Sequence, residues 1–166
     1  MQLNASKFIF LFFLLFSLSG MGQQPYSNVD FRSPVDFPIL LSGTFGELRS
    51  GHFHSGIDIK TGGVSGKDIL AIGDGWVSRV KVSPGGFGNA IYITHPEGYT
   101  SVYAHLDEFG SKVSAYVLSE QYKQKSFAVD IPVAKGRFPV KKGEVIAKSG
   151  NSGSSAGPHM HFEIRD

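Results

Sequence analysis

Cysteine is absent from all 166 residues of the sequence. No disulfide can therefore hold the fold together, and a lipid-anchored cysteine is excluded as well. Disulfides form outside the cytoplasm, so their absence is informative for an exported protein. Stability has to come from a packed core, or in part from a bound metal ion.

A large excess of either charge is also missing. The chain has 16 basic and 14 acidic residues, a formal net charge of +2. One of the basic residues, Lys7, lies in the N-terminal segment described next, so the remainder is almost neutral. Nucleic-acid binding needs a concentrated basic face, and short basic clusters such as "KGRFPVKKGE" fit solvated turns better. We therefore expect no nucleic-acid partner.

No apolar run is long enough to predict a membrane-spanning helix. The longest, from Phe8 to Leu18, has about 11 residues where a spanning helix needs roughly 20. It follows Lys7 and precedes the small residues Gly20 and Gly22, which is the pattern of a secretory signal peptide. We expect a signal peptide at residues 1–22 and a mature protein in the periplasm or outside the cell without a membrane span. An uncleaved anchor is the alternative.

The sequence after this segment is rich in glycine, β-branched and aromatic residues, and it breaks into short runs separated by turn signals. Alternation predicts strands in "ILAIGDGWVSRVKVS", "NAIYITH" and "TSVYAHL", the last two joined as a hairpin. Only residues 111–126 have helical spacing. We expect one all-β domain over residues 39–166, a mostly antiparallel sheet or β-sandwich with a short helical insertion, after a lead-in at residues 23–38.

His54 and Asp58 stand four residues apart in "HFHSGIDIK". A straight strand would separate them by about 13 Å, too far to bind one ion. The chain must therefore bend near Ser55 and Gly56, where glycine tolerates unusual dihedral angles. An imidazole and a carboxylate would then converge. A third ligand from a histidine elsewhere would complete a zinc site with one position open, as in catalytic sites.

Two more histidines stand near the end of the chain, in "GPHMHFEIRD". In a strand, His159, His161 and Glu163 would share one face and Met160, Phe162 and Ile164 the other. The pattern predicts apolar residues inside and imidazoles outside. It is equally typical of an amphipathic surface strand whose histidines have no function. Glu163 is either a hydrogen-bond partner of a ligand or a surface residue.

Taken together and in this order, "HSGID", "YAHL" and "GPHMHFE" resemble the lysostaphin and LytM type of zinc metallopeptidases, peptidase family M23. The stretches "ILAIGDGWVSRV", "GFGNAIYITH" and "VKKGEVIAKSGNSG" agree with this resemblance, which covers residues 39–166. It implies the duplicated hybrid motif fold and hydrolysis of peptides in bacterial cell walls. It further implies that His54, Asp58 and His161 bind zinc, and that His105 and His159 are catalytic.

Two other histidines serve as controls, because neither matches the family motif. We expect His52 in a loop or groove position, and His95 facing solvent at a turn.

The sequence also departs from the compact family pattern in two places. Residues 107–139 form an insertion, which we expect beside the groove, where it would alter substrate access. The chain ends five residues after His161. We therefore expect either a terminal strand that frays or one that the inserted helix covers, in a domain shortened or cut from a longer protein.

Three functions are compatible with these features. The leading one is a zinc endopeptidase acting on cross-links or stem peptides of peptidoglycan. The second is a cell-wall-binding or amidase-activator module that uses the same fold without cutting. The third, a carrier domain, is suggested by "VKKGEVIAKSG" alone and has no use for the His54, Asp58 and His161 set.

Overall fold

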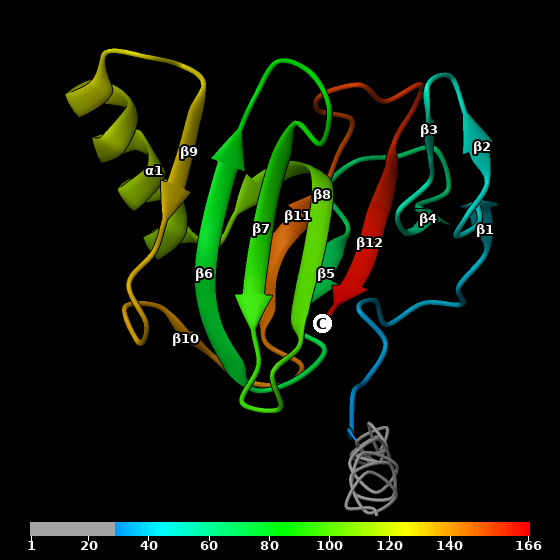
Figure 1. Cartoon of the computed structure of the whole chain (residues 1–166), viewed down its shortest axis with the longest axis horizontal. Helices are drawn as coiled ribbons and strands as arrows, with labels where there is room; N and C mark the ends of the chain where they lie inside the picture. Colours follow the sequence, from blue (N-terminus) through cyan, green and yellow to red (C-terminus); the bar gives the residue numbers. More distant parts are fainter. Residues whose placement is uncertain (1–28) are drawn as a thin grey trace, which may run out of the picture.

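The computed structural model describes residues 29–166, so the expected signal peptide at residues 1–22 lies outside the described part. The described chain is an antiparallel β-structure with one helix (Figure 1). In chain order its elements are β1 (Leu41–Gly43), β2 (Leu48–Arg49), β3 (His52–Phe53), β4 (Ile57–Lys60), β5 (Asp68–Leu70), β6 (Gly75–Val82), β7 (Asn89–Thr94), β8 (Thr100–Phe109), α1 (Ser111–Gln124), β9 (Val129–Pro132), β10 (Pro139–Val140), β11 (Val145–Ser149) and β12 (His159–Arg165). The predicted β-fold with one short helix is confirmed.

Ten strands form one sheet, and β2 and β3 form a separate hairpin. The main path through the sheet runs β1-β4-β12-β8-β7-β6-β10, while β11 pairs with β8 and β5, and β9 pairs with β6. The long strand β8 pairs with β12 over its first half and with β11 near its end. It therefore joins two layers, with β5 and β11 behind the front sheet in Figure 1.

The core lies between these layers. Fully buried side chains from both include Ile59, Ile69, Val80, Ile93, Tyr103, Leu106 and Met160. Met160 and Phe162 of β12 point into this core, as their alternation predicts, whereas Ile164 at the end of the strand is exposed. The other face of β12 is not the exposed face expected from the sequence, because both His161 and Glu163 are buried.

The helix and β9 of the inserted segment, residues 107–139, lie at the opposite side of the sheet from β12, while residues 107–109 end β8. Strand β9 pairs with β6, and α1 contacts β9 and β8 (Figure 1). No described residue of the insertion lines the groove presented below. The expectation that the insertion flanks the groove is therefore wrong: it extends the sheet at β6, several strands away from β12.

Strand β12 lies inside the sheet, with β4 on one side and β8 on the other. Backbone hydrogen bonds on both sides hold it, so neither expectation for this strand, fraying or a covering helix, fits the structure.

At 14 residues, α1 is too short to cross a membrane, and residues 29–166 contain no other helix that could do so.

Candidate metal centre

A bend between β3 and β4 brings His54 and Asp58 together, as the sequence predicts. Strand β3 ends at Phe53, β4 begins at Ile57, and the bend falls on Gly56. At Gly56 the backbone passes so close to β12 that an added Cβ would lie 2.3 Å from the Phe162 carbonyl oxygen. A side chain at this position would push the bend away from the strand that carries His161.

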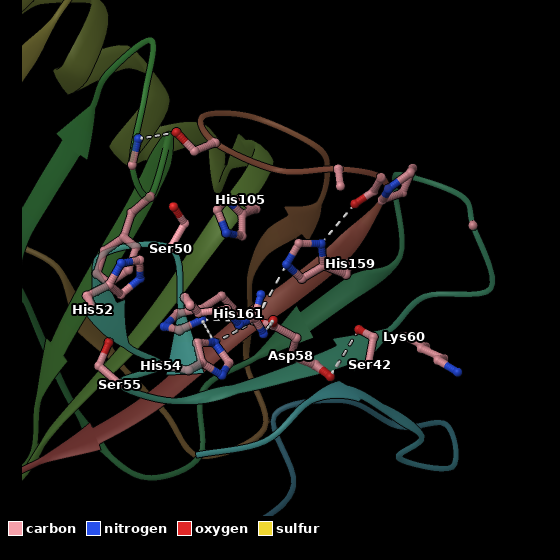
Figure 2. A pocket seen from close by; sticks show the side chains of 18 of the residues that line it. Ser42, Ser50, His52, His54, Ser55, Asp58, Lys60, His105, His159 and His161 are labelled. Atoms are coloured by element: carbon pink, nitrogen blue, oxygen red, sulfur yellow. Dashed lines mark hydrogen bonds and ion pairs between the residues drawn. The ribbon is translucent and has the colours of Figure 1, made fainter. Parts of the chain in front are cut away.

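The register between β4 and β12 supplies the third member of the cluster, because His161 pairs with Asp58. The His54 Nε2 atom lies 2.9 Å from His161 Nδ1 and 3.1 Å from Asp58 Oδ1. His161 Nδ1 is 3.0 Å from the same carboxylate oxygen. The structure thus brings together three of the five residues predicted for the site, which Figure 2 shows at the base of a pocket.

The protons of both rings are directed away from the cluster. His54 Nδ1 donates to the Thr44 carbonyl at 2.8 Å, and His161 Nε2 donates to the Glu163 carboxylate at 2.8 Å. Both partners can only accept, so the neutral rings present lone pairs at the remaining nitrogens. Two imidazole nitrogens and one carboxylate oxygen therefore converge as acceptors.

Only a cation satisfies such a triangle of acceptors. Burial disfavours ionisation of Asp58, but hydrogen bonds from the protonated rings of His159 and His161 and from Arg49 outweigh it and hold the pKa of this carboxyl well below its usual range. Burial opposes protonation of His161, but the Asp58 and Glu163 carboxylates outweigh it and raise the pKa of His161. A proton can occupy the cluster in acid, and a metal ion competes with it as pH rises.

The donor set fits zinc. Two imidazole nitrogens and one carboxylate oxygen lie within 4.8 Å of one another. This combination matches the ligands of catalytic zinc sites. Glu163 acts as the outer partner of His161 and is itself only 3% exposed. Burial opposes its ionisation, but hydrogen bonds from His161, Arg165 and Ser55 lower the pKa of Glu163 to about 2. Of the two interpretations of Glu163, the structure therefore supports the hydrogen-bond partner.

A β-bulge turns His105 toward the same pocket. Between Leu106 and Tyr103, β8 has one residue more than the facing segment of β7. His105 adopts a left-handed φ of 57°, an uncommon conformation for a residue other than glycine. Ala104 and His105 consequently lie on one face, and Leu106 returns to the core. Regular alternation would have directed His105 into the core instead.

His105 and His159 face each other above the cluster, with ring centroids 4.7 Å apart. His105 Nδ1 donates to the Ser152 carbonyl at 2.8 Å, and His159 Nδ1 donates to the Gly157 carbonyl at 2.8 Å. Each ring therefore presents its Nε2 lone pair, and that of His159 is 3.5 Å from Asp58 Oδ1. Burial lowers the pKa of His105 to about 4.

A pocket of about 760 Å³ contains all five predicted site residues. Its walls come from the segment at residues 49–55, of which Figure 2 labels Ser50, His52 and Ser55, and from loops at residues 86–87 and 154–158. Asp58 is the only acidic side chain among the described residues that line it. We refer to this pocket as the groove.

The two control histidines have different fates. His52 is exposed on β3 and lines the groove, outside the cluster, so the expected groove position is confirmed. The expectation that His95 faces solvent is wrong, since only 1% of it is exposed. Its ring nitrogens contact the Asp74 carbonyl and the Ser101 hydroxyl, each at 2.8 Å, and its ring packs 4.9 Å from that of Phe31.

Several groups around the site escaped the sequence analysis. Arg49 donates to Asp58, the ring of Phe87 packs 4.9 Å from that of His161, and the Thr44 and Ser152 carbonyls orient two histidines. Backbone carbonyls have no sequence signature. A single sequence also holds no signal for Arg49, because its contact with Asp58 depends on how the β2–β3 hairpin folds back.

Comparisons with known proteins agree with this geometry. The sequence profile of Peptidase family M23 matches residues 52–122 and 124–166. The chain is 34% identical over 118 residues to the DD-carboxypeptidase/endopeptidase Mpg of Neisseria meningitidis, covering 71% of this chain and 21% of that protein. It is also 34% identical over 122 residues to the Murein hydrolase activator NlpD of Escherichia coli, covering 74% and 25%.

Among solved structures, a zinc containing peptidase from Vibrio cholerae is similar, with a TM-score of 0.59 and 29% identity over 82% of this chain and 36% of that one. The chain spans only about a fifth to a quarter of the length of the two curated relatives.

Proposed function

Because the chain belongs to peptidase family M23, we propose that it is a zinc-dependent endopeptidase that hydrolyses peptide bonds in the cross-links or stem peptides of peptidoglycan. One observation carries this proposal. Three buried acceptor atoms converge at the base of an open groove, and two further imidazoles present lone pairs beside them. A purely structural zinc site would be closed by a fourth protein ligand, whereas this set leaves room for substrate.

His54, Asp58 and His161 would hold the zinc ion. Bound there, zinc would supply Lewis acidity toward the scissile carbonyl and lower the pKa of a water molecule. The hydrogen bonds from the two ligand rings to Thr44 and Glu163 keep their lone pairs aimed at the ion. Such outer partners fix both tautomer and ring orientation.

His105 and His159 would move the protons of the reaction. Each has its Nδ1 proton fixed on a backbone carbonyl, so each can accept a proton only at Nε2, on the groove side. Hydrolysis needs one proton removed from the attacking water and one delivered to the leaving amine, and a pair of imidazoles can perform both tasks. In this proposal they replace a glutamate base.

A place in the bacterial cell envelope follows from the same proposal. The names of two relatives refer to murein or to DD-peptidase activity, and peptidoglycan lies outside the cytoplasm. Export through the signal peptide expected at residues 1–22 would bring the domain to that substrate.

Digestion of purified peptidoglycan tests the proposal. The zinc-loaded protein should produce new peptide amino and carboxyl termini, detected by mass spectrometry of the released fragments, and chelation should abolish them. Restoring zinc should restore cleavage. A zinc-loaded, folded protein that releases no new peptide termini from peptidoglycan of several cross-link types would contradict the proposal.

The similarity to NlpD favours one alternative, an activator of murein hydrolases that does not cut. A non-cutting activator has no need for zinc ligands, yet His54, Asp58 and His161 converge here. The same digest separates the two functions. An endopeptidase creates peptide termini by itself, whereas an activator only accelerates the bond cleavage typical of an added murein hydrolase.

A further inference from the structure

One short turn, residues 44–47, contacts His54 of the metal site directly and is linked to a second member, Asp58, through Arg49. The Thr44 carbonyl accepts the Nδ1 proton of His54, and the Glu47 carboxylate accepts from Arg49 Nη2 at 3.2 Å. Backbone hydrogen bonds from Gly46 to His54 and from His54 to Glu47, both 2.8 Å, fix the turn against the β3–β4 bend. The turn is therefore coupled to the cluster through both side chain and backbone.

Arg49 completes this coupling at Asp58. Its Nη2 donates to Asp58 Oδ2 at 2.8 Å, while Oδ1 of the same carboxylate faces His54 and His161. The two carboxylate oxygens thus have separate tasks. With Oδ2 held by a guanidinium, rotation of the carboxylate is restricted and Oδ1 stays in the triangle.

The backbone at Gly43 confirms how closely this pair is seated. A Cβ added there would lie 2.2 Å from Arg49 Nη2 and 2.5 Å from Asp58 Oδ2. The contact therefore exists only because residue 43 has no side chain. Strand β1, the hairpin and β4 each contribute one member of this arrangement.

We propose that Arg49 is a positioning residue, which fixes the Asp58 carboxylate so that Oδ1 points at the metal ion. The inference rests on the proposed function in taking zinc as that ion. Arg49 contacts Oδ2 of Asp58 and not the oxygen that faces the two imidazoles, so it acts through Asp58. Removal of such an outer partner costs about 10- to 100-fold in metal affinity in other sites.

Zinc affinity, measured by competition with a chromophoric chelator, tests this role without any assay of cleavage. Arg49→Ala should weaken zinc binding by about 10- to 100-fold. Arg49→Lys should recover part of that loss, because a single donor atom makes the contact with Asp58. Glu47→Gln is the matched control: it removes the hairpin's exposed ion pair but leaves the Arg49–Asp58 pair, so affinity should stay within about 3-fold.

A second variant displaces the same pair without removing its charges. Gly43→Ala should weaken zinc binding to an extent similar to Arg49→Ala, since its methyl group occupies the position of Nη2 and Oδ2. Gly110→Ala is its control, because the nearest atom to an added Cβ there is the Ile146 carbonyl oxygen at 3.4 Å, far from the groove. Circular dichroism of the zinc-free proteins should confirm that each variant folds.

The outcomes separate the two proposals. If the unaltered protein binds no zinc, the proposed function fails. If it binds zinc and folded Arg49→Ala binds equally well, the function stands and the positioning role is refuted. Equal losses in Glu47→Gln and Arg49→Ala would also refute it, since Arg49 would then act only by stabilising the hairpin.

Discussion

Two buried polar clusters that contain histidine occupy opposite faces of the same sheet, and they differ in what surrounds the imidazoles. On the core face, His95 contacts the Ser101 hydroxyl, which also contacts the Tyr103 hydroxyl, and the latter accepts from the Ile72 amide at 3.0 Å. On the groove face, His54 and His161 meet the Asp58 carboxylate. Both groups are almost fully buried.

The difference lies in the partners. A hydroxyl can donate and accept, so the His95 network can satisfy every polar group with its own protons. In the His54 cluster, a carboxylate meets two lone pairs whose rings have already donated elsewhere. The first arrangement is complete as a part of the core, while the second requires a cation from outside. Burial alone therefore does not identify a functional histidine, whereas the balance of donors and acceptors does.

The largest test of this comparison removes a member of each group. Asp58→Ala should lose at least about 100-fold in zinc affinity, because the loss of a ligand exceeds the loss of an outer partner. Ser101→Ala should keep its zinc. Elemental analysis after dialysis gives the number of zinc ions per chain. Full zinc occupancy in folded Asp58→Ala would show that the ligand set is wrong.

Zinc should also stabilise only the groove side. Chelation should lower the melting temperature of the unaltered protein, since the proposed ligands on β4 and β12 meet only in the folded state. In Asp58→Ala, chelation should have little effect. A melting temperature that responds equally to chelation in both proteins would place the stabilising metal elsewhere.

The next test separates ligands from proton carriers within the groove. His105→Ala and His159→Ala should each keep zinc but reduce turnover by about 100-fold or more, the scale of losing a positioned acid or base. His52→Ala, which alters the groove wall outside the cluster, is the control and should remain within about 3-fold. Zinc loss in His159→Ala with retention in His161→Ala would mean that their roles are exchanged.

A smaller effect concerns pH and the folded state. Burial lowers the pKa of His105 to about 4 from an ordinary value of 6.5, so the unfolded chain binds this proton more readily. Above pH 6.5 His105 is neutral in both states and does not change the free energy of unfolding with pH. As pH falls from 6.5 toward 4, protonation of the unfolded chain lowers the free energy of unfolding by at most about 3 kcal/mol.

His159, His161 and Asp58 face His105 and titrate as well, so the measured quantity is a difference. The free energy of unfolding of the zinc-free protein minus that of His105→Ala should decrease between pH 7 and 4.5. A difference independent of pH in this range would show that burial does not shift this group.

The smallest effect belongs to the core network. Ser101→Ala leaves His95 Nε2 without its partner, and an unsatisfied buried polar group costs about 1–3 kcal/mol. Urea denaturation should show this loss with turnover unchanged once the protein is folded and zinc-loaded. A fall in turnover without a fall in stability would connect the core network to the groove and weaken the distinction between the two groups.

Much of the site could be predicted from sequence because its parts are local. Gly56 marks the bend that joins His54 to Asp58, and alternation separates the face of His161 from that of Met160. The β-class, the hairpin of β7 and β8 and the extent of α1 also follow from local patterns. These features depend on neighbours within a few residues.

The remaining features depend on pairings between distant segments. The burial of His95 requires Asp74 and Ser101 from other elements, and the place of the insertion depends on β9 choosing β6 as its partner. Strand β12 is central rather than at an edge because β4 pairs with the side that β8 leaves open. No pattern within these segments specifies their partners.

The bulge at His105 has a consequence for anyone who wishes to transplant this site. Side-chain direction along a strand follows a parity rule, odd residues one way and even residues the other, and the extra residue of β8 reverses that parity at one point. A copy of β8 that paired regularly with all its residues retained would keep every motif letter of the groove in the sequence, yet it would turn His105 into the core and Leu106 out of it. A copy of the site therefore has to carry its irregularity along with its histidines.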